Sequence, residues 1–186
     1  MGWIRDLDSG EGSTHQDYLF LYGLVALLQP RRILEIGTNT GVSSIVMTLA
    51  AREVGIRCEI DTIDPDEVRT ATARTQFVAH GVSDQIRVHS GPSGRILPTL
   101  AGNRYDLAFV DGDHTYEGCR DDLAAVRAMT DWIVVHDTQH MPGVRRAVEE
   151  FSAAQSILID CPRGQQYTHS QVVWQSAPGM ALIRVR

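Results

Sequence analysis

Residues 33–41 read ILEIGTNTG, and this short stretch decides the fold. A mostly apolar run carries Glu35, and two glycines, Gly37 and Gly41, then bracket a polar triplet. Gly37 permits a sharp turn and the close approach of a ligand, while Gly41 opens the next segment without crowding it. The pattern predicts a strand, a ligand-binding turn and a helix, in that order.

The rest of the chain repeats this alternation of strand and helix five times. Short apolar runs predict strands at 32–37, 58–64, 86–91, 105–112, 132–137, 156–161 and 179–186. Helical spacing predicts helices at 14–28, 42–55, 66–81 and 116–129, with another opened by Pro142. We therefore expect an α/β fold, with a Rossmann-like, mostly parallel sheet and helices on both faces. At 186 residues, a single domain over 1–186 is expected.

Composition excludes several classes of protein. The net charge of -6 and the lack of a basic stripe argue against a nucleic-acid binder. No apolar run approaches the ~20 residues that span a bilayer, so no membrane partner is expected. Three scattered cysteines without Cys-x-x-Cys spacing, and no secretion signal at the start, favour a cytoplasmic location.

Ligands of parallel sheets bind beyond the carboxyl ends of the strands, so the residues there matter most. A dinucleotide fingerprint needs three glycines, but this chain has Glu35, Gly37 and Thr40 at those places, which argues against a nicotinamide cofactor. Asp64 follows the second strand, where a carboxylate can accept both ribose hydroxyls or cap the next helix. The turn at 90–94 could flank a flat purine or be only a turn.

Two loops rich in Asp and His follow the fourth and fifth strands. They should meet at one rim of the sheet and bring together Asp111, Asp113, His114, His136, Asp137 and His140. One member, Asp113, is alternatively a helix cap. Carboxylates beside imidazole suit either a divalent cation or general-base chemistry.

Five segments, read together, carry a family resemblance: ILEIGTNTGVSS, IDTIDPD, YDLAFVDGDHTYEG, VVHDT and GMALIRVR. Over about residues 14–186 the chain resembles the class I S-adenosylmethionine-dependent methyltransferases. Within them it is similar to the small-molecule O-methyltransferase branch, with caffeoyl-CoA-type, macrolide-sugar and cephalosporin-hydroxylase-like members. The resemblance implies a seven-stranded sheet whose last strand, 179–186, is antiparallel.

The resemblance also implies roles for individual residues. The cofactor, S-adenosylmethionine, would be bound at its methionine end by Glu35, Gly37, Thr38 and Gly41. Asp64 would hold the ribose, Gly91 with Ser93 would border the adenine, and Asp111 would lie near the methionyl amine and the acceptor. An acidic ligand environment also suits a donor that carries a sulfonium and an ammonium group.

Metal-dependent relatives have an acid triad at the ends of strands four and five, whereas here the set is Asp111, His136 and Asp137. A divalent cation such as Mg²⁺ is therefore an open option. The implied reaction is transfer of a methyl group to a hydroxyl of a small molecule, with His114 as the first choice of base and His136 as the second.

Other readings remain open from the sequence. The chain could be a partner protein that binds the cofactor without catalysis, or, less in keeping with its glycines, a nicotinamide-dependent oxidoreductase. The N-terminal segment and helix, 1–30, are the best candidate to cover the cofactor site. Acceptors could be sugar hydroxyls, catechol-like phenols or polyketide hydroxyls. The resemblance is compatible with a homodimer, although no pattern specifies an interface.

Overall fold

The computed structural model describes residues 13–153, 156–160, 167–169, 172–174 and 179–185, with side chains for 13–153 and 179–185. The strands are β1 Arg32–Ile36, β2 Glu59–Asp64, β3 Ile86–Ser90, β4 Leu107–Val110, β5 Trp132–His136, β6 Ser156–Asp160, β7 Tyr167–His169, β8 Val172–Trp174 and β9 Met180–Arg184. The helices are α1 His15–Leu28, α2 Val42–Glu53, α3 Glu67–Ala79, α4 Ser93–Leu100, α5 Tyr116–Val126 and α6 Pro142–Ser152.

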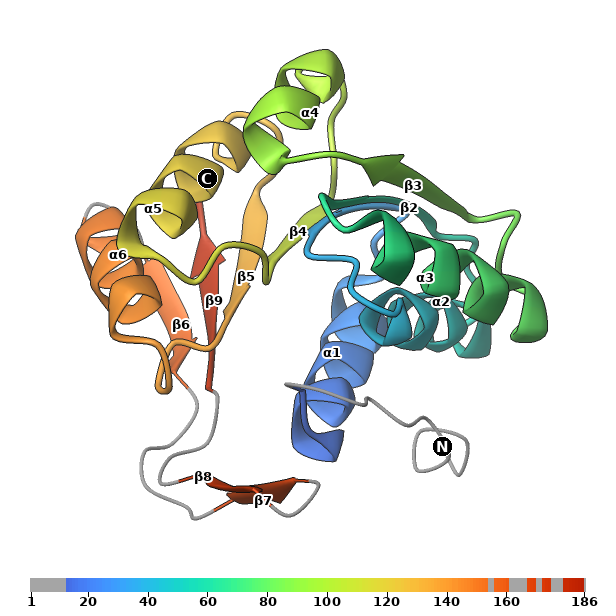
Figure 1. Cartoon of the computed structure of the whole chain (residues 1–186), viewed down its shortest axis with the longest axis horizontal. Helices are drawn as coiled ribbons and strands as arrows, with labels where there is room; N and C mark the ends of the chain where they lie inside the picture. The colour runs from blue at the N-terminus through green and yellow to red at the C-terminus, as the bar shows by residue number, and fades with distance from the viewer. Residues whose placement is uncertain (1–12, 154–155, 161–166, 170–171, 175–178, 186) are drawn as a thin grey trace.

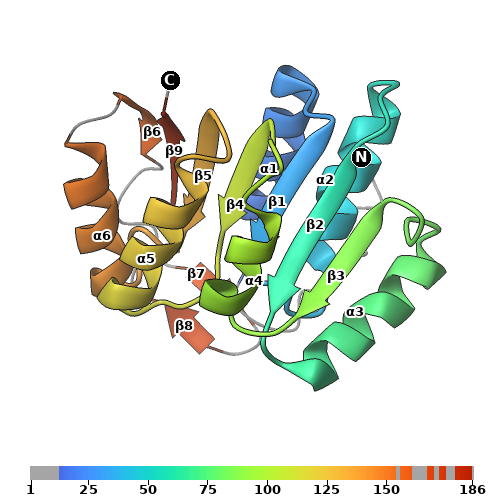
Figure 2. The same ribbon diagram turned by 90° about the horizontal axis from the view of Figure 1, so that it is seen from above.

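The main sheet has the strand order β3-β2-β1-β4-β5-β9-β6 (Figures 1 and 2). Strands β1 to β5 pair in parallel, while β9 runs antiparallel to both of its neighbours, β5 and β6. The prediction of a mostly parallel sheet with an antiparallel last strand is confirmed. The chain winds outward from β1 to β3 and then returns to β4, so the switch point lies between β1 and β4.

Helices cover both faces of this sheet, as predicted. The side chains of β1 alternate between two cores, with Ile33 in one and Leu34 and Ile36 in the other. Helices α1, α2 and α3 pack on the first face, and α4, α5 and α6 pack on the second (Figure 2). Cys58 and Cys119 are buried free thiols, one in each core, and burial raises the pKa of both to about 12.

Helix starts follow local capping chemistry. Thr14 and Asp17 form a capping box at the start of α1. Two alternatives raised by the sequence do not hold: α3 is capped by Asp66 rather than Asp64, and α5 by Thr115 rather than Asp113. In each case the capping residue directly precedes the first helical residue.

None of the helices in the described part of the chain combines the length and apolar character that crossing a membrane requires.

One helix was not predicted at all. Helix α4 is eight residues long and has Pro98 inside it, which weakens the sequence signal for a helix. Its apolar side still packs into the second core through Leu97 and Leu100. Tertiary burial therefore outweighs the local preference at this position.

A substitution at Gly41 tests how tightly the turn after β1 is packed. It has φ +88°, and a Cβ there would lie 2.5 Å from the buried ring of Phe77. We expect Gly41→Ala to lower the free energy of unfolding by about 3 kcal/mol or more, from the left-handed backbone and the clash together. Urea unfolding of the purified variants measures this loss.

Gly55 is the matched control, because it has φ +79° and open space around its Cβ position. Gly55→Ala should cost only about 1 kcal/mol, the backbone contribution alone. Equal losses in the two variants would show that contact with Phe77 does not set the cost at Gly41.

Candidate functional site

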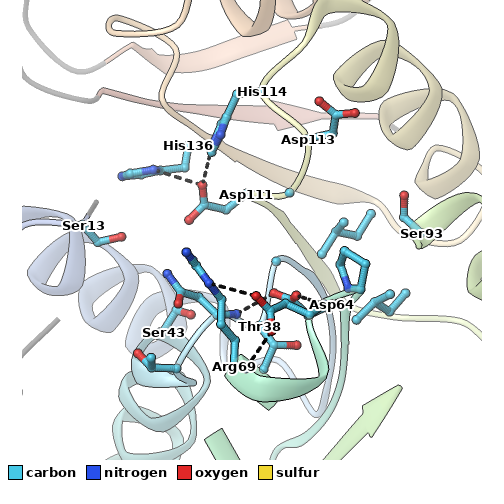
Figure 3. Close-up of a pocket in the computed structure, with 18 of the residues that line it drawn as sticks. Ser13, Thr38, Ser43, Asp64, Arg69, Ser93, Asp111, Asp113, His114 and His136 are labelled. Carbon is cyan, nitrogen blue, oxygen red and sulfur yellow. Dashed lines mark hydrogen bonds and ion pairs between the residues drawn. The ribbon is translucent and has the colours of Figure 1, made fainter. Parts of the chain in front are cut away.

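A cavity of about 600 Å³ opens at the carboxyl ends of the parallel strands. Figure 3 shows its two sides: Asp111, His114 and His136 face Thr38, Ser43 and Asp64 across the hollow. Ser13 and Tyr18, just before and within α1, complete the lining together with Ser93 at the start of α4. The cavity therefore lies at the switch point, where the strand order predicts a ligand.

The turn after β1 forms one wall of the cavity. Gly37 has φ +101°, and a Cβ there would lie 2.0 Å from the carbonyl oxygen of Asp111, so only glycine fits. Asn39 also has positive φ, and its backbone N–H donates to Asp64 Oδ2 at 2.8 Å. The second oxygen, Asp64 Oδ1, accepts from the backbone N–H of Asp66 at 2.8 Å. Asp64 thus holds the glycine turn against the end of β2.

Glu35 lies beneath this wall and not in the cavity, whose lining does not include it. The residue is completely buried, and its carboxylate accepts hydrogen bonds from the hydroxyls of Ser43 (2.5 Å) and Ser44. Burial raises the pKa of Glu35 to about 7, although these hydrogen bonds by themselves would lower it. The expectation of direct ligand contact by Glu35 is corrected: its side chain reaches the cavity only through Ser43.

The opposite wall is the cluster predicted from the two Asp and His loops. His114 Nε2 lies 2.9 Å from Asp137 Oδ2 and 3.3 Å from Asp111 Oδ1. His136 Nδ1 lies 3.2 Å from Asp111 Oδ1 and 3.5 Å from Asp137 Oδ2. Asp137 adopts φ +60°, a left-handed conformation that Asp tolerates better than most residues. Two carboxylates and two imidazoles therefore converge at the ends of β4 and β5.

Electrostatic interactions within this cluster shift the pKa of each of the four side chains. Hydrogen bonds to Asp111 and Asp137 raise the pKa of His114 to about 10. Burial alone would lower the pKa of His136, but the carboxylates around it hold that pKa well above its ordinary value. Burial alone would raise the pKa of Asp111 and of Asp137, but the histidines hold both below the usual range. Both imidazoles are therefore protonated at neutral pH in this arrangement.

Three of these residues have the donor set and spacing of a metal site. One ligand atom each from Asp111, His136 and Asp137 lies within 4.8 Å of the other two. His136 is 1% exposed, and neither ring nitrogen makes a well-oriented hydrogen bond to the described residues. Its Nε2 lies 3.4 Å from Asp17 Oδ2 on α1. A histidine ligand commonly has such a carboxylate at its second nitrogen, so these residues fit a bound cation.

The structure separates the predicted site residues into two groups. Those that line the cavity are Gly37, Thr38, Asp64, Ser93, Asp111, Asp113, His114, His136 and Asp137. Four others lie outside the lining: Glu35 lies beneath it, Gly41 packs on Phe77, the Gly91 N–H donates to the Asp64 carbonyl, and His140 lies in the loop beyond β5. Residues 1–12, before Ser13, lie outside the described residues.

Asp17 was missed as a site residue. In the sequence it stands three residues after Thr14, which is typical of a capping box, and the Thr14 backbone N–H donates to Asp17 Oδ2 at 2.7 Å. That same oxygen faces His136. No sequence signal connects the start of α1 with the end of β5, because only the folded sheet brings them together.

The family model described as a methyltransferase domain matches residues 34–138, more than half of the chain and the part that builds both walls of the cavity. The chain belongs to the methyltransferase domain family. The match begins inside β1 and ends just after the Asp137 loop, so it includes the glycine turn and the Asp and His cluster together.

Two curated relatives align with about half of this chain. The O-methyltransferase hkm8 from Aspergillus hancockii is 41% identical over 90 residues, which cover 48% of this chain and 34% of the relative. The catechol O-methyltransferase from Mycobacterium tuberculosis is 39% identical over 94 residues, 50% of this chain and 41% of the relative. The chain thus spans less than half the length of these two relatives.

Solved structures match the methyltransferase domain over nearly its whole length. An O-methyltransferase from Bacillus cereus in complex with SAH has a TM-score of 0.74 at 19% identity, covering 97% of this chain and 85% of that one. The O-methyltransferase TomG from Streptomyces achromogenes, in complex with SAM, has a TM-score of 0.71 at 23% identity, covering 93% of this chain and 81% of that one. At these identities the likeness shows a shared fold.

The raised pKa of Glu35 predicts a pH dependence of stability. The ordinary value is 4.5 and the folded value about 7, so the folded protein holds more protons between these limits and loses stability as pH rises through them. Glu35→Gln has no such proton. We expect the stability of wild type relative to Glu35→Gln to fall by about 2 kcal/mol between about pH 5 and pH 7.5.

Urea unfolding of both proteins at a series of pH values measures this difference. Any constant offset from altered hydrogen bonds to Ser43 and Ser44 cancels in the pH dependence. A difference that stays flat with pH would mean that the pKa of Glu35 is not raised in the folded protein.

Proposed function

We propose that the protein is an S-adenosylmethionine-dependent methyltransferase that transfers a methyl group to a hydroxyl of a small molecule. The observation that carries this proposal is one cavity with the glycine turn and Asp64 on one wall and the Asp and His cluster on the other. Such a cavity has a donor end and an acceptor end within reach of each other. Membership of the methyltransferase domain family and the named O-methyltransferase relatives support the same reaction.

The donor occupies the glycine-turn side in this proposal. Asp64 accepts hydrogen bonds from the ribose hydroxyls, for which it retains lone pairs beyond the two backbone donors already bound. Gly37, Thr38 and Ser43 border the methionine end, and Ser93 borders the adenine on the far side. SAM and SAH are bound in the structural neighbours from Streptomyces achromogenes and Bacillus cereus, which supports this ligand class.

Charge favours this donor over a dinucleotide. The cavity lining includes five carboxylates, Asp64, Asp66, Asp111, Asp113 and Asp137, against one arginine, Arg69, and two histidines. The excess of acid attracts a sulfonium and an ammonium group. A pyrophosphate would meet these same carboxylates unfavourably. A nicotinamide cofactor therefore fits the cavity poorly, in agreement with the missing glycines.

A divalent cation fits the second wall. Asp111, His136 and Asp137 would hold it, and Asp17 would orient His136 by accepting from its second ring nitrogen. A bound cation lowers the pKa of a coordinated hydroxyl and orients it for attack. The imidazole donor favours Mn²⁺ or Zn²⁺ over Mg²⁺, which prefers oxygen ligands.

His114 is the proposed proton acceptor for the hydroxyl. Its side chain is 39% exposed and borders the cavity, so a substrate can reach it. When Asp111 and Asp137 ligate a cation, they stabilise the protonated form of His114 less, so the pKa of His114 falls. Cation binding and the availability of His114 as a base are thus linked, and the remaining catalytic task is to hold donor and acceptor about 3 Å apart in line.

A partner protein that binds the donor without catalysis is the second candidate, because nothing described specifies the acceptor. Sugar hydroxyls, catechol-like phenols and polyketide hydroxyls all remain candidate acceptors, with the catechol O-methyltransferase relative favouring phenols. The aromatic residues of 166–174, which could line an acceptor pocket or pack an edge, lie outside the described side chains. A homodimer and the covering role of 1–30 stay predictions.

The first test is a calorimetric titration with S-adenosylhomocysteine. We expect micromolar binding to wild type and at least about tenfold weaker binding to Asp64→Ala, because the ribose hydroxyls lose a charged acceptor. Asp121→Asn is the control, since this exposed carboxylate is paired with Arg120 and does not line the cavity. No binding to folded wild type would end the methyltransferase proposal.

The second test concerns turnover with a panel of catechols, sugars and polyketide alcohols. His114→Ala should lower kcat by about a hundredfold or more while leaving the affinity for S-adenosylhomocysteine unchanged, because it removes proton transfer alone. Chelation should abolish turnover, with Mn²⁺ or Zn²⁺ restoring it better than Mg²⁺. If His114→Ala weakens cofactor binding without changing kcat, His114 is not the base. If chelation leaves turnover unaffected, the reaction does not use a divalent cation.

A further inference from the structure

A second hollow, separate from the proposed donor cavity, lies between α4 and α5 and measures about 410 Å³. Its walls are largely apolar and come from Leu97, Pro98 and Ala101 on the α4 side and from Ala125 and Met129 on the α5 side. We call it the α4–α5 groove. Its size lies within the range of small-molecule sites in proteins, which are typically apolar with a few polar anchors.

The polar part of the α4–α5 groove carries one sign of charge. Asp113, Asp121 and Asp122 line it, and the lining includes no Arg, Lys or His. Asp121 is already paired with Arg120 at 2.7 Å, and Asp113 accepts from the backbone N–H of Thr115 at 2.8 Å. Asp122 is different, because no ion pair reaches it from the described residues and its side-chain partner is the neutral Ser93 hydroxyl.

Asp122 is also deeply placed, with only 4% of its surface exposed. Burial raises the pKa of this carboxyl to about 6, opposed by the nearby Ser93 hydroxyl and reinforced by Asp113 and Asp121. A buried carboxylate without a cation is costly, and proteins rarely leave one in that state. An apolar groove that ends at such a group has the shape and charge to receive a cation with an apolar body.

We propose that the α4–α5 groove is a binding site for a small organic cation, a protonated amine on a compact apolar group. The ammonium binds Asp122, and the apolar part lies against Leu97, Ala125 and Met129. Charge complementarity selects the amine over a neutral or anionic molecule of the same shape. The site is distinct from the proposed donor cavity, although Ser93 and Asp113 border both.

The test is a calorimetric titration of the full chain with cyclohexylmethylamine, and with cyclohexylmethanol as its neutral counterpart. We expect the amine to bind at least about tenfold more tightly than the alcohol, as a hydrogen bond to a charged group implies. Repeating the titration with S-adenosylhomocysteine present separates the two cavities, because the amine should still bind to the groove. No measurable binding of the amine overturns the proposal.

Three variants locate the bound amine. Asp122→Asn keeps the shape and should lose the preference for the amine, while Asp121→Asn, whose charge is already paired, should change affinity by less than about twofold. Ala125→Leu should fill the groove and weaken both ligands. Amine binding that S-adenosylhomocysteine abolishes, or that persists in Asp122→Asn and Ala125→Leu, would place the amine elsewhere and refute the site. Failure of S-adenosylhomocysteine to bind would count against the methyltransferase proposal alone.

Discussion

The close contact between Gly37 and the Asp111 carbonyl is the constraint on which the rest of the site depends. A Cβ at Gly37 would come within 2.0 Å of that oxygen, so the turn after β1 can pass the end of β4 only without a side chain. The backbone is fixed on both sides, because Gly37 N–H donates to Ile63 O and Asp111 N–H donates to Ile36 O, each at 2.8 Å. This one contact brings the glycine turn and the Asp and His cluster to opposite walls of a single cavity.

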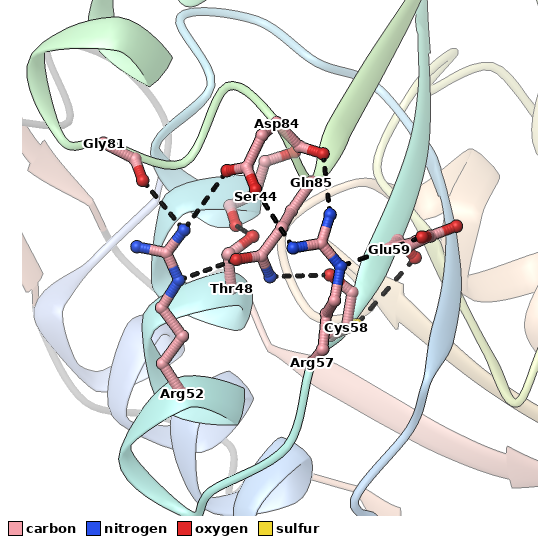
Figure 4. Close-up of polar contacts among 9 residues, drawn as sticks. All are labelled: Ser44, Thr48, Arg52, Arg57, Cys58, Glu59, Gly81, Asp84 and Gln85. Atoms are coloured by element: carbon pink, nitrogen blue, oxygen red, sulfur yellow. Dashed lines mark hydrogen bonds and ion pairs between the residues drawn. The ribbon is translucent and has the colours of Figure 1, made fainter.

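The carboxylates at the two ends of the sheet have different charged partners. At the amino end, Asp84 is held by Arg57 and Arg52, and Gln85 ties Arg52 to the Cys58 carbonyl (Figure 4). Such pairs fasten the loops around β2 and β3, and those that are exposed contribute little individually. At the carboxyl end, Asp111 and Asp137 have only histidines as charged partners. These partners are titratable imidazoles rather than arginines, so a cationic ligand can take the place of their protons.

Sequence reasoning predicted what local patterns encode. The glycine turn, Asp64 and the Asp and His loops follow directly from residues just after apolar strands, and the sheet brings them together as expected. It misjudged features that depend on packing: Glu35 looks like a ligand residue but is buried under Ser43, and α4 forms despite Pro98 because Leu97 and Leu100 are buried. Asp17 was missed as a site residue since its partner His136 is more than 100 residues away in sequence.

The position of α1 follows from the same electrostatics. His136 is fully enclosed between Asp111 and Asp137 on one side and Asp17 on the other, and Asp17 is itself fixed by the capping bond from Thr14. The start of α1 is therefore attached to the proposed cation ligands through a single imidazole. Any change in the charge of that imidazole or its carboxylates alters the contact with α1. Because Ser13 and Tyr18 border the same cavity, the N-terminal helix should respond to what occupies it.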